Sequence, residues 1–74
     1  MTDEVIKLAA TYFKVDGDTL KPGDDLFETL GIDSMQALDL LTELEMEFDV
    51  EIPDYEVRDV KTFEELAQLI ARRR

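Results

Sequence analysis

Residues 30–48 read LGIDSMQALDLLTELEMEF and decide the fold of this chain. Apolar residues recur there at three- and four-residue spacing, which places them on one broad stripe of an α-helix. They are Ala37, Leu40, Leu41, Leu44 and Phe48. Asp33 is a good helix N-cap, and with Gln36 it resembles a capping box. The pattern therefore predicts a long helix that begins at Ser34 and ends at about Asp49.

The hydroxyl of Ser34 is the chemical feature of this helix start. Unpaired N–H groups and the positive end of the helix dipole favour an attached phosphate at such a position. The chain has no histidine and no cysteine, so the commonest groups that activate a nucleophile are missing. We therefore interpret Ser34 as a residue that is modified, and we predict no catalytic residue and no enzymatic activity. The alternative is an ordinary polar residue in a first helical turn.

Three sequence segments carry a family resemblance. Residues 30–35 (LGIDSM), preceded by residues 25–27 (DLF) and followed by residues 48–54 (FDVEIPD), resemble the acyl carrier proteins. This resemblance implies a 4′-phosphopantetheine arm, attached covalently to Ser34 by a phosphopantetheinyl transferase that uses magnesium. It also implies that the arm holds acyl intermediates as thioesters and delivers them to enzymes of fatty-acid, polyketide or related biosynthesis.

The same resemblance implies that the helix over residues 34–49 is the recognition face. Partner enzymes that load, condense or tailor the acyl group would dock on it through basic patches. The acids at positions 39, 43 and 47 form an i,i+4 ladder of like charge, which weakens a helix and so indicates a role other than stability. The residues expected to contact the transferase and other partners are Asp33, Met35, Gln36, Leu38, Asp39, Thr42, Glu45 and Met46.

The acyl chain is expected to slip between helices, because an exposed alkyl group forgoes about 0.8 kcal/mol per CH₂ of burial. The expected lining is Phe27, Leu41, Leu44, Ile52 and Tyr55. Gln36 and Met46 stand where familiar bacterial fatty-acid carriers often have acids. This departure leaves the pathway open between fatty-acid synthesis and a dedicated polyketide or peptide assembly line.

The rest of the chain predicts further helices and no strands. A first helix, capped by Thr2 and ended by residues 16–18, has apolar side chains at helical spacing. They are Val5, Ile6, Leu8, Ala9, Tyr12 and Phe13. A long connection follows, with one short turn capped by Asp25. Its apolar anchors are Leu20, Leu26, Phe27, Leu30 and Ile32.

Two helices complete the prediction. Residues 54–60 indicate a short, weak helix with Tyr55 and Val60 directed inward. Thr62 and Glu65 form a capping box for the last helix, whose terminal arginines suit the negative end of its dipole. Its inward stripe is Phe63, Leu66, Ala67, Leu69 and Ile70. The predicted fold is all-α: a small four-helix bundle of three longer helices and one short helix, with a long first loop.

Composition narrows the function further. The 74 residues form one predicted domain, residues 1–74, with a formal net charge of −11, which argues against nucleic acid and anionic membranes as partners. No apolar run approaches the roughly 20 residues that span a bilayer, and no signal peptide is visible. We expect a cytoplasmic monomer without stable membrane insertion.

The acidic residues also raise the question of a metal ion. Residues 16–18 (DGD) hint at calcium, but the further ligands of an EF-hand loop are absent, so we predict no dedicated metal site. Loose divalent binding to the acidic surface is expected instead. An alternative function is an acidic helical protein-interaction module without a prosthetic group. That alternative explains the charge but leaves the motif at residues 30–35 unexplained.

Overall fold

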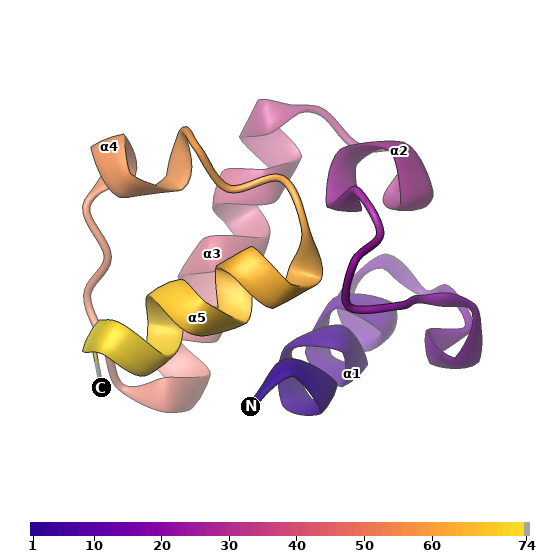
Figure 1. Cartoon of the computed structure of the whole chain (residues 1–74), viewed down its shortest axis with the longest axis horizontal. Helices are drawn as coiled ribbons and strands as arrows, with labels where there is room; N and C mark the ends of the chain where they lie inside the picture. Colours follow the sequence, from indigo (N-terminus) through magenta and orange to yellow (C-terminus); the bar gives the residue numbers. More distant parts are fainter. Residues whose placement is uncertain (74) are drawn as a thin grey trace.

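A computed structural model describes residues 1–73, apart from the side chain of Asp54. Every element in this range is helical, as predicted, and α1, α3 and α5 are the three long helices (Figure 1). The elements are α1 (Thr2–Phe13), the 3₁₀ turn η1 (Gly17–Thr19), α2 (Leu26–Leu30), α3 (Ser34–Phe48), α4 (Asp54–Val57) and α5 (Phe63–Arg73). The short turn expected in the long first connection is α2.

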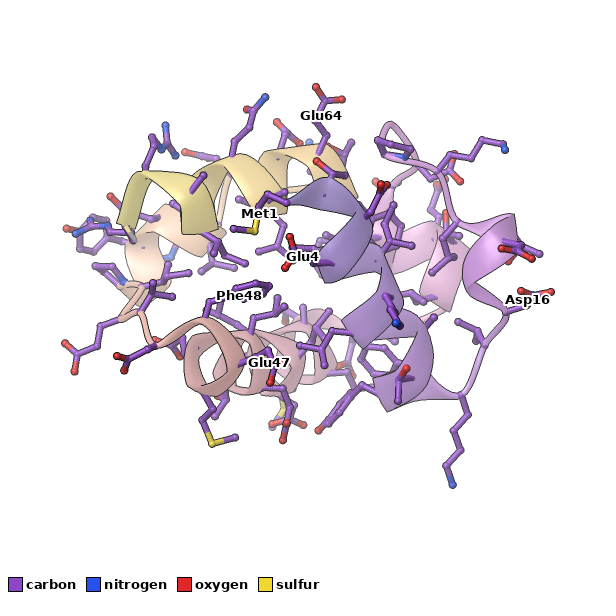
Figure 2. All side chains as sticks on the ribbon, turned by 90° about the horizontal axis from the view of Figure 1, so that it is seen from below. Met1, Glu4, Asp16, Glu47, Phe48 and Glu64 are labelled. Atoms are coloured by element: carbon purple, nitrogen blue, oxygen red, sulfur yellow. The ribbon has the colours of Figure 1, made fainter. Side chains whose placement is uncertain are left out.

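The core forms where α1 packs against α5 and α3. The stripe predicted for α5 is wholly buried, and in α3 the stripe is buried except for Phe48, which is half-buried. Figure 2 shows Phe48 directed from the end of α3 into the space between α3 and α1. Amphipathic periodicity alone therefore predicted which side of α3 and which side of α5 face the core.

Helix α1 departs from the prediction at both ends. Its N-cap is Met1, whose carbonyl oxygen accepts hydrogen bonds from the N–H groups of Glu4 and Val5, both 3.1 Å long, so Thr2 is not the cap. The helix ends at Phe13 because Lys14 adopts the left-handed conformation, with φ 58°. Tyr12, one of the apolar positions predicted for this helix, is 41 % exposed. Its ring packs edge-on against the ring of Phe13, with 5.0 Å between the ring centroids.

The long connection before α3 is fastened to the start of α5. The N–H of Leu26 donates to the carbonyl of Lys61 (2.7 Å), and the N–H of Glu64 donates to the carbonyl of Pro22 (2.9 Å). As predicted, Asp25 caps α2, with Oδ1 accepting from the N–H groups of Phe27 and Glu28. These bonds fix the position of α2, the helix that precedes α3 in the chain. The predicted apolar anchors of this loop are all buried or half-buried.

Helix α4 is shorter than predicted, since it ends at Val57. Val60 is buried, but Tyr55 is 67 % exposed, so the prediction that it points inward is wrong. Val57 is the residue of α4 that packs against the core. Tyr55 lies two residues earlier, about 200° around the helix, and therefore faces away.

An ion pair joins α4 to the end of α5. Arg73 donates to Glu56 through Nε (2.9 Å) and Nη2 (2.5 Å). The hydrogen bond from Arg73 holds the pKa of the Glu56 carboxyl below its usual range. The Thr62–Glu65 capping box of α5 is present, and Arg72 and Arg73 occupy its last turn. The third terminal arginine, Arg74, lies outside the described residues.

The surface of the molecule is acidic with a few exposed apolar side chains. Among the side chains that the structure describes, no three carboxylates gather in a geometry that would hold a metal ion. None of the helices in residues 1–73 is both long and apolar enough to cross a membrane. Three exposed apolar side chains have the largest accessible fractions: Met35 (74 %), Tyr55 (67 %) and Met46 (66 %).

Candidate functional site

The first turn of α3 is held by the predicted capping box. Asp33 Oδ1 accepts a hydrogen bond from the N–H of Gln36 (2.9 Å), and Gln36 Oε1 accepts one from the N–H of Asp33 (3.2 Å). Gly31, just before it, ends α2 with φ 67°. No atom would contact a Cβ at that position, so the left-handed backbone, not lack of space, favours glycine there.

Ser34 is the first residue of α3 and is exposed to solvent. No residue that the structure describes makes a hydrogen bond with its hydroxyl, and the side chain that caps α3 is that of Asp33. The first N–H groups of a helix have no partner within it and carry the positive end of the dipole. A hydroxyl that is free, exposed and beside these donors fits a covalently attached phosphate group.

Ser34 also lies at the edge of an open pocket of about 450 Å³. Ligand pockets commonly have volumes of roughly 300–1,000 Å³, so the volume of this pocket lies in the range of small-molecule sites. In Figure 1, α4 lies at the same end of the molecule as the first turn of α3. The pocket is lined by Phe27, Ser34, Ala37, Leu38, Val57 and Arg58.

This lining agrees only in part with the predicted acyl pocket. Phe27 contributes to it, whereas Leu41, Leu44 and Ile52 belong to the packed core, with at most 5 % of each residue accessible. Tyr55 faces solvent. The stripe positions of α3 predicted the buried core correctly. They do not show which of these residues line the open pocket and which are enclosed in the core.

Three residues that line this pocket are not among the predicted site residues: Ala37, which was predicted only as part of the core stripe, Val57 and Arg58. A helix of four residues such as α4 is too short for its apolar pattern to show that Val57 faces inward. Arg58 had a visible signal: it is the first basic residue after Lys21 in a long acidic stretch.

The outward face of α3 gathers most of the predicted recognition residues. Met35, Leu38, Thr42 and Met46 follow one another at three- and four-residue spacing, and all four are exposed. Residues at this spacing lie on one side of a helix. Asp39 is exposed beside them. The face is thus an apolar stripe next to acids, which suits a partner that combines apolar and basic contacts.

Glu45 and Gln36 also serve the fold. Glu45 is half-buried, and its Oε2 accepts a hydrogen bond of 2.9 Å from the N–H of Ile52. The bond ties the end of α3 to the segment that leads to α4. Gln36 is used in the capping box. The side chains of these two residues are therefore engaged within the chain, unlike that of Asp39.

Comparison with known proteins gives the family. A profile of the phosphopantetheine attachment site matches residues 3–70. The acyl carrier protein of Chlorobium phaeovibrioides is 32 % identical over 71 residues, which cover 96 % of this chain and 91 % of that protein. The acyl carrier protein of Campylobacter lari is 35 % identical over 68 residues, which cover 92 % and 88 %.

A longer relative shows a higher local identity. The mitochondrial acyl carrier protein of Dictyostelium discoideum is 45 % identical over 56 residues, which cover 76 % of this chain and 46 % of that protein. The matches to the two bacterial proteins extend over about nine-tenths of each aligned sequence. The chain therefore belongs to the acyl carrier protein family, whose members hold acyl groups on a covalently attached 4′-phosphopantetheine group.

Proposed function

We propose that Ser34 is the attachment residue of this carrier. The observation that supports this most directly is an exposed hydroxyl with no described hydrogen-bond partner, at the start of a capped helix. Ser34 Oγ would attack the phosphorus of coenzyme A that bears the pantetheine. The new P–O bond forms as 3′,5′-ADP leaves, and the serine proton passes to the transferase.

The residues around Ser34 have supporting roles in this proposal. The Asp33–Gln36 capping box fixes the backbone of the first turn of α3, so that Ser34 is presented at a defined position. When attached, the arm supplies a terminal thiol that holds the acyl group as a thioester. The chain itself performs no chemistry on the acyl group, and catalysis belongs to the partner enzymes. Residues 1–74 act as a single carrier domain.

The outward face of α3 is the proposed docking surface. Asp39 supplies exposed charge, and Met35, Leu38 and Met46 supply exposed apolar area. Basic patches on the phosphopantetheinyl transferase and on acyl-loading, condensing or tailoring enzymes would complement it. Such docking is fast and sensitive to salt. Because Gln36 and Met46 are uncharged, the proposed clients include enzymes of polyketide or related assembly as well as fatty-acid synthesis.

Intact-mass spectrometry tests the attachment directly. The purified protein is incubated with coenzyme A, magnesium and a promiscuous phosphopantetheinyl transferase. We expect the wild type to gain one phosphopantetheinyl group and Ser34→Ala to gain none. Thr11→Ala removes an exposed hydroxyl from α1, outside the predicted docking residues; it is the matched control and should be loaded normally. An adduct that survives Ser34→Ala would move the attachment site elsewhere.

A wild-type protein that gains no mass, while a known carrier is loaded in the same tube, would favour the alternative function. In that case the chain would be an acidic interaction module without a prosthetic group.

A further inference from the structure

Among the side chains that the structure describes, Arg58 is the one charged group that lines the pocket beside Ser34. The rest of the lining, apart from the serine, is apolar: Phe27, Ala37, Leu38 and Val57. Arg58 is exposed, and it forms no ion pair with any carboxylate whose side chain the structure describes. Its guanidinium lines the same pocket as Ser34, from which a group attached to Ser34 Oγ would extend.

The positive charge of Arg58 suits it to bind a phosphate group at this site. A phosphodiester on Ser34 adds an anion next to Asp33, in a chain that already has a formal net charge of −11. Arg58 is the only basic residue between Lys21 and Lys61. A planar guanidinium offers paired N–H donors that match two phosphate oxygens, so it binds such an anion better than a lysine does.

We propose that Arg58 is a positioning residue that binds the phosphodiester on Ser34 and holds the base of the arm against α3 and α4. The first N–H groups of α3 and the guanidinium of Arg58 would both donate hydrogen bonds to the phosphate. The arm would then leave Ser34 along the apolar lining formed by Leu38 and Val57 instead of projecting freely into solvent. This inference rests on the proposed attachment at Ser34.

The experiment compares Arg58→Gln with Lys61→Gln in fully loaded protein. Lys61 is exposed and near in sequence but does not line the pocket, so its replacement removes the same charge without touching the site. Loading is taken to completion and verified by intact mass, so that a change in the rate of the transferase does not affect the readouts. The readouts are the ³¹P NMR shift of the phosphodiester and the melting temperatures of the unloaded and loaded forms.

We expect the phosphodiester resonance to shift in Arg58→Gln and to stay at the wild-type position in Lys61→Gln. The gain in melting temperature on loading should fall in Arg58→Gln by about 2–4 °C at low salt, the size expected for one exposed ion pair in a domain this small. The fall should shrink in 0.5 M NaCl, because screening weakens the pair. Arg58→Lys should retain only part of the effect.

In a second measurement, only the wild-type protein is loaded. The Nε–H resonance of Arg58, assigned by its loss in Arg58→Gln, should move when the wild type is loaded. An unmoved resonance, together with equal behaviour of the two Gln variants, would overturn the proposal. Failure of the wild type to gain the arm at all would instead contradict the attachment at Ser34, so the two failures are distinguishable.

Discussion

Glu45 lies where the outward face of α3 meets the segment leading to α4. It is one of the predicted docking residues of α3. Its carboxylate also accepts a hydrogen bond from the N–H of Ile52, which lies in the segment that leads to α4. A buried N–H without an acceptor is costly, and Ile52 is buried. A charge reversal at Glu45 would therefore disturb the fold and the docking surface together. Glu45 is a poor probe of docking taken alone.

We predict that Glu45→Ala lowers the free energy of unfolding by about 1 kcal/mol, since one hydrogen bond to a half-buried N–H is lost. Glu45→Gln keeps an acceptor oxygen while it removes the charge, and should lose less than half as much. Urea denaturation followed by circular dichroism measures both variants. Equal stability of Glu45→Ala and the wild type would show that the bond to Ile52 contributes nothing.

Three helices end in the left-handed conformation, with different residues at that position. Gly31 ends α2 with φ 67°, Lys14 ends α1 with φ 58°, and Asp49 ends α3 with φ 54°. Glycine adopts this conformation without strain, and aspartate tolerates it better than most residues. Lysine does so at a cost. The end of α1 is therefore the most strained of the three.

We predict that Lys14→Gly raises the free energy of unfolding by about 0.5–1 kcal/mol, because a left-handed lysine becomes a glycine. Lys14→Ala is the matched control: it removes the same side chain but keeps the strain, so its stability should stay near the wild type. Gly31→Ala should lower stability by about 1–2 kcal/mol. Thermal melts of the three variants check the ranking, and a Lys14→Ala as stable as Lys14→Gly would argue against strain at this position.

The acids of the molecule are distributed unevenly. No basic residue interrupts the chain between Lys21 and Arg58, and α3 lies wholly within that stretch. Self-repulsion of this kind destabilises a compact protein, so a partner surface of opposite charge explains the pattern better than stability does. The 3₁₀ turn η1 lies away from α3, next to Asp16 in Figure 2. Asp18 in η1 therefore supplies an acid outside the proposed docking surface.

We predict that Asp39→Lys slows loading by a phosphopantetheinyl transferase roughly tenfold at low ionic strength, because the steering charge is reversed. The same charge change in the control Asp18→Lys should alter the rate by less than about twofold, since no docking contact is lost. In 0.5 M NaCl the two variants should converge. The measurement is the loading rate at subsaturating carrier, followed by mass. Equal rates for the two variants at low salt would contradict the docking surface.

The helices that were predicted correctly are specified by nearby residues. The Asp33–Gln36 and Thr62–Glu65 capping boxes, and the apolar stripes of α3 and α5, all operate within one or two helical turns. Interactions of that range depend on residue order and helical period, which are both visible in the sequence. The all-α class and the start of α3 at Ser34 follow from them.

The predictions that failed concern one helix end and one short helix. Thr2 does not cap α1, and Tyr55 does not point inward. A helix of four residues such as α4 has no period from which its buried side can be inferred. Its register is instead set by contacts with the rest of the molecule, among them the ion pair between Glu56 and Arg73.

Sequence order thus specified an exposed serine at the start of an acidic helix, and the family motif around it specified a carrier. Three-dimensional packing decided what surrounds that serine. Arg58 and Val57 lie far from Ser34 along the chain but line the same pocket, and Glu45 meets Ile52 across a turn. Such contacts arise only when separate helices pack to bury a shared core, and no local pattern of residues encodes them.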